Sequence, residues 1–272
     1  MRHLAEQRRL PDAVLLCAVG ERPDDALIDS LPYPVSDIRS ERGLTKQRNA
    51  ILDSAADADV LLFIDDDFLC APDYLERLEG LMERHPEIAM ATGTVVADGI
   101  KGPGIEPEEA LPLLVDATPP TDRMETVYNG YGCNMAVRMS SAEGLRFDEA
   151  LPLYGWLEDV DFSRRLAARG RIVRSEALRG VHLGVKSGRS PGRQLGYSQI
   201  SNPVRLMRAG TMARRRALSI MLRNVLSNAV RAPRPEPWVD RVGRLRGNLQ
   251  GLSDLLSGRL DPMKAVELGR RP

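Results

Sequence analysis

Three consecutive carboxylates, Asp65, Asp66 and Asp67, directly follow the apolar run 60–64. The run predicts a buried strand, and in α/β proteins ligands bind beyond the C-terminal ends of such strands. Adjacent carboxylates repel one another, so a hard dication shared by Asp65 and Asp67, which face the same side of an extended chain, would relieve the repulsion. Oxygen ligands favour Mg²⁺ or Mn²⁺, ions that bridge carboxylates to substrate phosphates. The alternative is a solvated acidic turn whose aspartates cap the next helix.

A second acidic pair, Glu158 and Asp159, stands at the start of a helix predicted over 157–169. Acidic residues are common in any first helical turn, because they complement the helix dipole. The aromatic approach through Tyr154 and Trp156 would nevertheless place these carboxylates in a partly apolar cleft, where a raised pKa suits a general base. The pattern leaves both interpretations open.

His182 and Arg48 are two further candidates for a binding site. A lone histidine between apolar neighbours is more often a core residue than a ligand, but the nearby Gly180 and Gly184 indicate a close approach to another group. Arg48 lies in a helix predicted over 45–56, where its guanidinium could pair with phosphate.

These residues must be positioned by the secondary structure of the first 180 residues. Short apolar runs alternate there with helical patterns, which is typical of βαβ units around a mostly parallel sheet. A loop with at most one short helix is expected over 98–120. Strands are expected over 13–19, 35–39, 60–64, 88–96, 133–138 and 171–174, and helices over 24–31, 45–56, 72–84 and 157–169.

The C-terminal part has a different pattern. Glycines recur from 184 to 196 among Lys186, Arg189 and Arg193, which predicts a mobile, cationic loop. Two helices are expected, over 203–230 and 238–256, with prolines between them. The first has apolar residues at helical spacing together with many arginines, so it is predicted to be a basic amphipathic helix.

Charge divides the chain in the same way. The 272 residues carry 38 basic and 38 acidic side chains. Residues 1–180 hold 20 basic and 33 acidic side chains, whereas residues 181–272 hold 18 basic and 5 acidic ones. A cationic segment favours an anionic partner, so attachment of 203–256 to an anionic membrane surface is one hypothesis. The alternative is that its apolar side chains pack on the rest of the protein. An aromatic content of 4% argues against a nucleic-acid partner.

The three cysteines are widely spaced, odd in number and include no CxxC pair, so neither a disulfide framework nor a zinc knuckle is indicated, and the reducing cytoplasm is favoured. The longest apolar run, 13–19, is too short to span a bilayer. We therefore expect a cytoplasmic protein. Any membrane attachment would be peripheral, at the inner face of the cytoplasmic membrane.

Six motifs follow one another along the chain: Arg22-Pro23, Gly43 with Arg48-Asn49, Asp65-Asp66-Asp67, Gly130-x-Gly132-x-Asn134, Glu158-Asp159 and His182. Taken in order, these motifs resemble the inverting glycosyltransferases of family 2. The resemblance covers about residues 12–185. It implies an α/β GT-A fold, a Rossmann-like mixed and mostly parallel sheet flanked by helices, as the nucleotide-sugar-binding and catalytic domain over 1–185. Residues 186–272 would form a basic loop and a helical extension.

The resemblance also implies roles. Asp65 and Asp67 would bind the metal, with Asp67 the more direct ligand and His182 a third contact. Asp159 would be the catalytic base with Glu158 beside it. The donor would be held by Val19, Gly20, Arg22, Arg48 and Asp66, with Lys186, Arg189 and Arg193 closing over its diphosphate; the sugar and acceptor pocket would contain Gly132, Cys133, Asn134, Tyr154 and Trp156.

The expected reaction is metal-dependent transfer of one sugar from a UDP, GDP or dTDP donor to a hydroxyl of a glycan or lipid-linked acceptor. No Gln-x-x-Arg-Trp motif follows Glu158-Asp159, which argues against processive polymer synthesis. Three alternatives stay open: a retaining transferase, a phosphatase of the haloacid dehalogenase type, and a membrane scaffold that binds nucleotide sugars without turnover.

Overall fold

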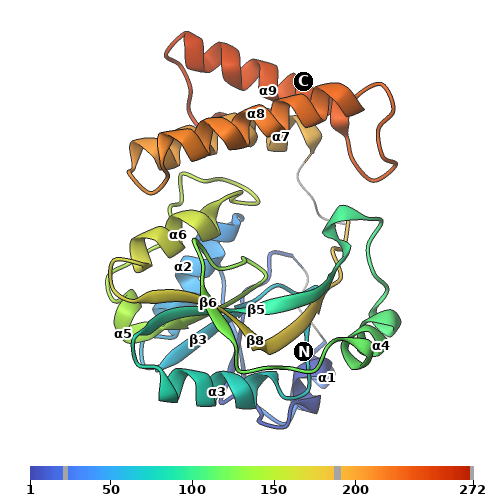
Figure 1. The fold of residues 1–272 in the computed structure, drawn as a ribbon, viewed down its shortest axis with the longest axis vertical. Helices are drawn as coiled ribbons and strands as arrows, with labels where there is room; N and C mark the ends of the chain where they lie inside the picture. The colour runs from blue at the N-terminus through green and yellow to red at the C-terminus, as the bar shows by residue number, and fades with distance from the viewer. Residues whose placement is uncertain (21–23, 187–190, 270–272) are drawn as a thin grey trace. The chain divides into compact units, whose positions relative to one another are not determined.

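A mixed β-sheet forms the centre of the N-terminal part of the chain (Figure 1). The computed structural model describes residues 1–20, 24–186 and 191–269. Within them the sheet consists of β3 (Val60–Ile64), β4 (Phe68–Cys70), β5 (Ile88–Asp98), β6 (Met124–Thr126), β7 (Asn134–Arg138) and β8 (Arg171–His182). The strand order is β3-β7-β5-β8-β4, with β6 also paired to β8. β3, β5 and β8 run in one direction, and β4, β6 and β7 run antiparallel to their neighbours.

Two pairs of strands in the described part of the chain are parallel. β1 (Val14–Leu16) pairs with β2 (Val35–Asp37), and the two longest strands, β5 and β8, pair with each other. Such pairs are what the alternation of strands and helices predicts. β4 and β6 were not predicted, because three residues are too few to show a period-two pattern. The expected α/β fold, a mixed sheet flanked by helices, is confirmed.

The helices predicted for the N-terminal part occur in the expected order, with small shifts at their ends. α3 packs its apolar face, including Tyr74, Leu78 and Leu81, on sheet residues such as Ile88 and Val173. The N-terminal helices are α1 (Asp25–Asp29), α2 (Leu44–Ser54), α3 (Tyr74–Arg84), α4 (Pro107–Asp116), α5 (Met139–Ala142) and α6 (Glu158–Leu166), with the 3₁₀ turns Arg2–Glu6 and Gly99–Lys101. The C-terminal helices are α7 (Gly192–Arg208), α8 (Arg214–Arg231), α9 (Arg241–Leu256) and α10 (Lys264–Glu267).

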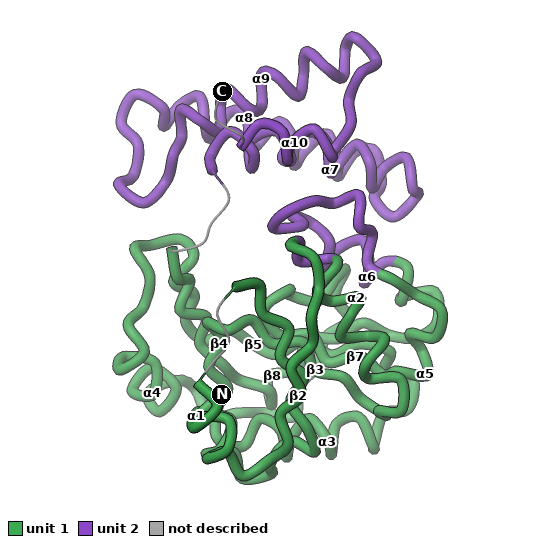
Figure 2. Tube along the Cα trace, turned by 180° about the vertical axis from the view of Figure 1, so that it is seen from behind, with its two compact units in different colours: residues 1–42, 46–146, 165–186 green, residues 43–45, 147–164, 187–272 purple. Residues whose placement is uncertain are grey.

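The chain forms two compact units, shown in separate colours in Figure 2. The first comprises residues 1–42, 46–146 and 165–186, and the second comprises 43–45, 147–164 and 187–272. The expected domain boundary near residue 185 lies beside one of the crossings between the units. Residues 147–164, which carry the Glu158-Asp159 motif, group with the C-terminal helices, although the sequence assigned them to the first domain.

The prediction of a mobile loop over 184–196 is wrong for its last part, since α7 begins at Gly192. The glycines there serve close packing of helices rather than mobility. A Cβ atom on Gly196 would lie 2.1 Å from the Arg244 carbonyl oxygen, and one on Gly247 would lie 2.1 Å from that of Arg193. The single helix expected over 203–230 is also wrong: the chain turns after α7, where Gly210 has a φ of +78°.

Candidate active site

Asp65, Asp67 and His182 lie together at one end of the sheet. β3 ends at Ile64, and the chain turns through the aspartates into β4, which pairs with β8 so that Phe68 lies opposite His182. Asp67 Oδ1 lies 3.4 Å from His182 Nε2. One potential ligand atom of each of the three residues lies within 4.8 Å of the others. The geometry thus brings together the three residues that the sequence analysis expected to bind a metal.

A second carboxylate, Asp98, holds His182 from the other side. Asp98 ends β5 at the position paired with His182, and its Oδ1 lies 2.9 Å from His182 Nδ1. Tyr131 donates a hydrogen bond of 3.0 Å from its hydroxyl to Asp98 Oδ2 and packs edge-on against the imidazole. This arrangement turns Nε2 toward Asp67, as in the carboxylate–histidine pairs that support metal sites.

Sequence reasoning missed Asp98 and Tyr131. A signal was present for Asp98, because it follows a predicted strand and the ends of parallel strands meet at one sheet edge. Nothing comparable in the sequence marks Tyr131, which lies in a loop before β7.

The charges of His182, Asp67 and Asp98 stabilise one another. Burial works against a charged imidazole, but hydrogen bonds to Asp67 and Asp98 outweigh it and raise the pKa of His182 to about 9. Burial also works against ionised Asp67 and Asp98, yet the bonds with His182 hold the pKa of each below its usual value. The imidazolium therefore offsets one of the two carboxylate charges here, and a dication bound through Nε2 would replace its proton.

Arg48 lies behind Asp65 in the protein interior. Its guanidinium is 3.2 Å from Asp65 Oδ1, donates to the Gly132 carbonyl at 2.8 Å, and stands 5.6 Å from the centre of the Phe63 ring. Burial raises the pKa of Asp65, and Arg48 opposes that shift. Because Arg48 is buried, the structure gives it a positioning role for Asp65, in place of the contact with the donor diphosphate expected from the resemblance.

The segment expected to line the sugar pocket is also largely internal. Asn134 is fully buried, and its Oδ1 accepts hydrogen bonds from Thr92 Oγ1 at 2.8 Å and from the Gly93 amide at 2.5 Å. Cys133 is buried, and its carbonyl accepts a bond from the Asp65 amide. Cys133 and Asn134 therefore tie β7 to its neighbours and fix the Asp65 backbone, which corrects their assignment to the pocket.

The remaining residues expected to bind the donor are dispersed. Val19 and Gly20 are exposed after β1, and Asp66 is exposed beside the metal cluster. Arg22 and Arg189 lie outside the described residues.

Lys186 and Arg193 have structural partners. Lys186 Nζ donates to the Gly99 and Ile100 carbonyls at 2.9 and 3.1 Å, which secures the chain next to Asp67. Arg193 lies in α7 and donates to Gln250 Oε1 of α9 at 2.6 Å. A shared role for both in a loop that closes over the donor is therefore not supported, because Arg193 belongs to a helix.

The loop before α6 is strained and well anchored. Leu153, Gly155 and Leu157 have φ values of 61°, 61° and 73°, a region that leucine rarely adopts. Hydrogen bonds hold the loop, among them one from Asn202 Nδ2 to the Trp156 carbonyl at 2.8 Å. Strain of this kind persists where the surroundings over-determine it, and it clusters at functional sites.

This loop delivers Glu158 and Asp159 to the first turn of α6. Glu158 is buried, and Asp159 is half-buried with its Oδ1 accepting a bond from the Val160 amide at 2.8 Å. An ionised acidic side chain at this position is stabilised by the helix dipole.

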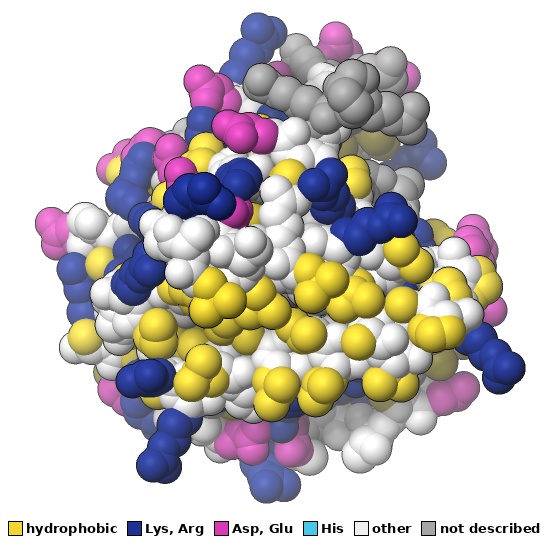
Figure 3. All heavy atoms as spheres, turned by 90° about the horizontal axis from the view of Figure 1, so that it is seen from above, with side chains coloured by type: hydrophobic (Ala, Val, Ile, Leu, Met, Phe, Trp, Pro, Cys, Tyr) yellow, Lys and Arg dark blue, Asp and Glu magenta, His cyan; other side chains and the backbone are white. Residues whose placement is uncertain are grey.

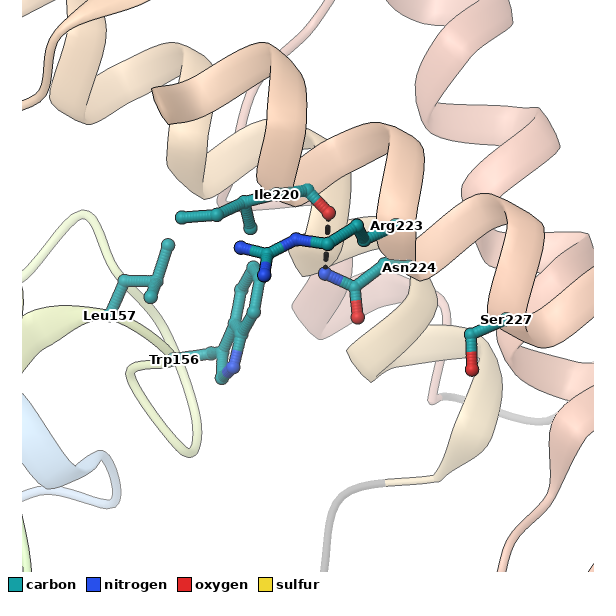
Figure 4. Close-up of a pocket in the computed structure, with 6 residues that line it drawn as sticks. All are labelled: Trp156, Leu157, Ile220, Arg223, Asn224 and Ser227. Atoms are coloured by element: carbon teal, nitrogen blue, oxygen red, sulfur yellow. Dashed lines mark hydrogen bonds between the residues drawn. The ribbon is translucent and has the colours of Figure 1, made fainter. Parts of the chain in front are cut away.

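A hollow of about 390 Å³ opens beside the same loop (Figure 4). Trp156 and Leu157 form one wall, and α8 supplies the other. Tyr154, also expected in the acceptor site, is half exposed and does not line it. The α8 residues, which sequence reasoning did not connect with this loop, are Ile220, Arg223, Asn224 and Ser227.

Comparison with known proteins identifies the central part of the chain. Residues 24–146 match the model of the family described as Glycosyl transferase family 2. This match covers slightly less than half of the chain, so the central part of the chain is similar to glycosyltransferase family 2. The matched part includes Asp65, Asp67 and Asp98, and it ends before Glu158 and His182.

A curated relative supports the same assignment over a shorter stretch. The glucosyl-dolichyl phosphate glucuronosyltransferase of Haloferax volcanii is 37% identical over 82 residues, which are 29% of this chain. The match spans about a quarter of the relative's own length, 26%.

Two solved structures are similar in fold. The mannosyltransferase PcManGT from Pyrobaculum calidifontis, in complex with GDP-Man and Mn²⁺, has a TM-score of 0.54 at 11% identity, covering 93% of this chain and 82% of that one. GalNAc-T7 with UDP, GalNAc and Mn²⁺ has a TM-score of 0.53 at 14% identity, and the match covers 94% of this chain and 50% of that one. At these identities the likeness establishes the GT-A fold.

Proposed function

We propose that this protein is a metal-dependent glycosyltransferase that moves one sugar from a nucleotide-sugar donor to a hydroxyl group. The observation that carries the proposal is the cluster of Asp65, Asp67 and His182, oriented by Asp98, in a chain whose central part is similar to glycosyltransferase family 2. Similar folds have been solved with GDP-Man or UDP and with Mn²⁺, which supports a nucleotide-sugar donor.

The three side chains fit a divalent ion. Two carboxylates and one imidazole supply oxygen and nitrogen ligands, and the imidazole favours Mn²⁺ over Mg²⁺. A bound ion would offset the negative charge that develops on the departing diphosphate. Asp98 and Arg48 would keep His182 and Asp65 in the orientation that binding needs.

Asp159 is the proposed general base. The acceptor hydroxyl has a pKa far above seven, so a carboxylate within hydrogen-bond reach must take its proton as it attacks the anomeric carbon. One base and one displacement give a product with inverted configuration. Glu158, buried at the same helix start, would shape the site around the base. A product that retains the donor configuration would contradict this assignment.

The acceptor is proposed to be a glycan or a lipid-linked molecule. The hollow beside Trp156 offers an aromatic face for a sugar ring and the guanidinium of Arg223 for an anionic group. The Haloferax relative is named for a dolichyl phosphate substrate, which supports the lipid-linked class. We place the protein in the cytoplasm, at the inner face of the membrane, with residues 203–256 as the segment that contacts lipid.

A thermal-shift screen tests the donor and the metal together. UDP-, GDP- and dTDP-sugars are each added with Mn²⁺, with Mg²⁺ or with EDTA, and only the true donor with a metal should raise the melting temperature. Release of nucleoside diphosphate is then measured with that donor. An Asp67→Asn variant should lose the metal-dependent part of the shift, and a shift that EDTA leaves unchanged would remove Asp65 and Asp67 from the proposal.

The same assays separate the alternatives. A phosphatase would release phosphate from simple phosphomonoesters, whereas a transferase would not. A scaffold would bind the nucleotide sugar without turnover, so the wild type and the Asp159→Asn variant would both be inactive.

A further inference from the structure

Apolar side chains that the fold leaves exposed form two rows on α8 and α9. The row on α8 repeats every four residues and is between 50% and 77% exposed, and the row on α9 repeats every seven and is between 41% and 88% exposed. In the view of Figure 3, apolar side chains form bands with basic side chains at their margins. We call these residues the two-helix apolar face: Leu218, Leu222, Leu226 and Val230 of α8 and Val242, Leu249 and Leu256 of α9.

The helices do not need this face for their own packing. Met221 of α8 is buried in a core with Ile200 and Val204 of α7. A buried amide network joins α7, α8 and α9 through Gln199, Asn228 and Asn248, with distances of 2.8 to 3.1 Å. The opposite side of each helix thus stabilises the unit, and the exposed leucines are free to contact another surface. Contiguous exposed apolar side chains of this kind mark interaction sites.

The charge around the two-helix apolar face is positive, and the few acidic side chains of these helices and the loop between them form ion pairs or cap a helix. Residues 214–256 contain nine arginines and three acidic residues. Glu236 pairs with Arg231 and Arg241, at 3.3 and 2.8 Å. Asp254 pairs with Lys264 at 2.6 Å, and Asp240 caps the start of α9.

Several arginines remain available to bind anions. In the described part of the chain, five of their side chains have no hydrogen bond or ion pair. They are Arg214, Arg215, Arg223, Arg234 and Arg246.

We propose that the two-helix apolar face lies on an anionic lipid bilayer, with α8 and α9 parallel to the membrane surface. Leucines would enter the boundary between head groups and acyl chains, and arginines would contact lipid phosphates. A second copy of this face fits poorly, because it would bring two sets of arginines together. Among the described residues no helix is long and apolar enough to cross a bilayer.

Vesicle co-sedimentation of the full chain tests the proposal. The protein should bind vesicles of mixed phosphatidylglycerol and phosphatidylcholine at low salt and dissociate from them at high salt. It should not bind vesicles of phosphatidylcholine alone. A Leu222→Glu, Leu226→Glu double variant should lower binding more than about tenfold, since it removes buried apolar area. An Arg215→Gln, Arg246→Gln variant should lower it about 25-fold, since each basic residue near such a surface contributes about 1 kcal/mol.

A matched control uses exposed apolar residues of α4. Leu111→Glu, Val115→Glu introduces the same charges at side chains that are 43% and 81% exposed, and it should leave vesicle binding unchanged. Circular dichroism confirms folding of each variant, and release of nucleoside diphosphate from a soluble donor reports the proposed transferase activity separately. Absence of binding at low salt, equal binding by the Leu222, Leu226 variant, or a wild-type dimer that this variant dissociates would overturn the proposal.

Discussion

His182 Nδ1 lies 2.9 Å from Asp98 Oδ1, at paired positions of the parallel strands β8 and β5. The pairing means that one sheet register sets the orientation of the imidazole, whose other nitrogen faces Asp67. Asp98 has no role in the sequence motifs of the site, yet it determines which nitrogen of His182 is available to a metal.

Asp98→Asn is expected to weaken Mn²⁺ binding by about 10- to 100-fold, because the carboxylate that orients the imidazole is lost. Isothermal titration calorimetry with Mn²⁺ measures the effect. Tyr131→Phe, which removes only the hydroxyl that bonds to Asp98, should cause a smaller loss in the same direction. Equal affinity of Asp98→Asn and wild type would show that His182 does not depend on Asp98.

Removal of the metal, or of Asp67, is expected to lower turnover of the true donor at least about a hundredfold, which corresponds to about 2.7 kcal/mol of transition-state stabilisation. The assay is release of nucleoside diphosphate after EDTA treatment and after addition of Mn²⁺ or Mg²⁺. Asp57→Asn is the control, because Asp57 is an exposed aspartate that belongs neither to the metal cluster nor to the proposed donor site. Full activity in EDTA would contradict a metal-dependent reaction.

Asp159→Asn should lower kcat by about 10²- to 10⁴-fold, the contribution typical of a positioned general base. The affinity for the nucleotide sugar should stay within a few-fold, since the amide has nearly the same shape and binds no donor phosphate. Single-turnover kinetics and equilibrium binding separate the two effects. A parallel loss of donor binding would assign Asp159 to the donor site instead.

Gly155→Ala is expected to lower stability by about 1–3 kcal/mol, because alanine is strained at positive φ and has no room. The new Cβ would lie 3.1 Å from Glu158 Cγ and 3.3 Å from Thr45 Cγ2. Gly210→Ala provides the control, since Gly210 has φ +78° and no atom within 4 Å of a built Cβ. Urea unfolding should show the larger loss for Gly155→Ala, and only that variant should also lower transferase activity.

Local patterns were sufficient to predict most elements of the sheet. The strand 60–64 and the helices α2, α3 and α6 were anticipated because period and capping residues act over a few neighbours. Gly192 and Gly196 were misinterpreted, because the same residue type serves a flexible loop and a tight helix contact. Which of these applies depends on what lies opposite, and for Gly196 that is Arg244, nearly fifty positions away.

The sequence by itself determined the candidate site residues: the Asp65–Asp67 carboxylates, the histidine that follows them and the acidic start of α6. The chemistry of these side chains can be inferred from their types and their order in the chain, without knowledge of long-range contacts. Only the tertiary structure decided that Asp98 supports His182, that Arg48 and Asn134 are internal, and that the leucines of α8 face outward. Those outcomes depend on strand register and on which helix face is covered, and both are set by packing between segments far apart in the chain.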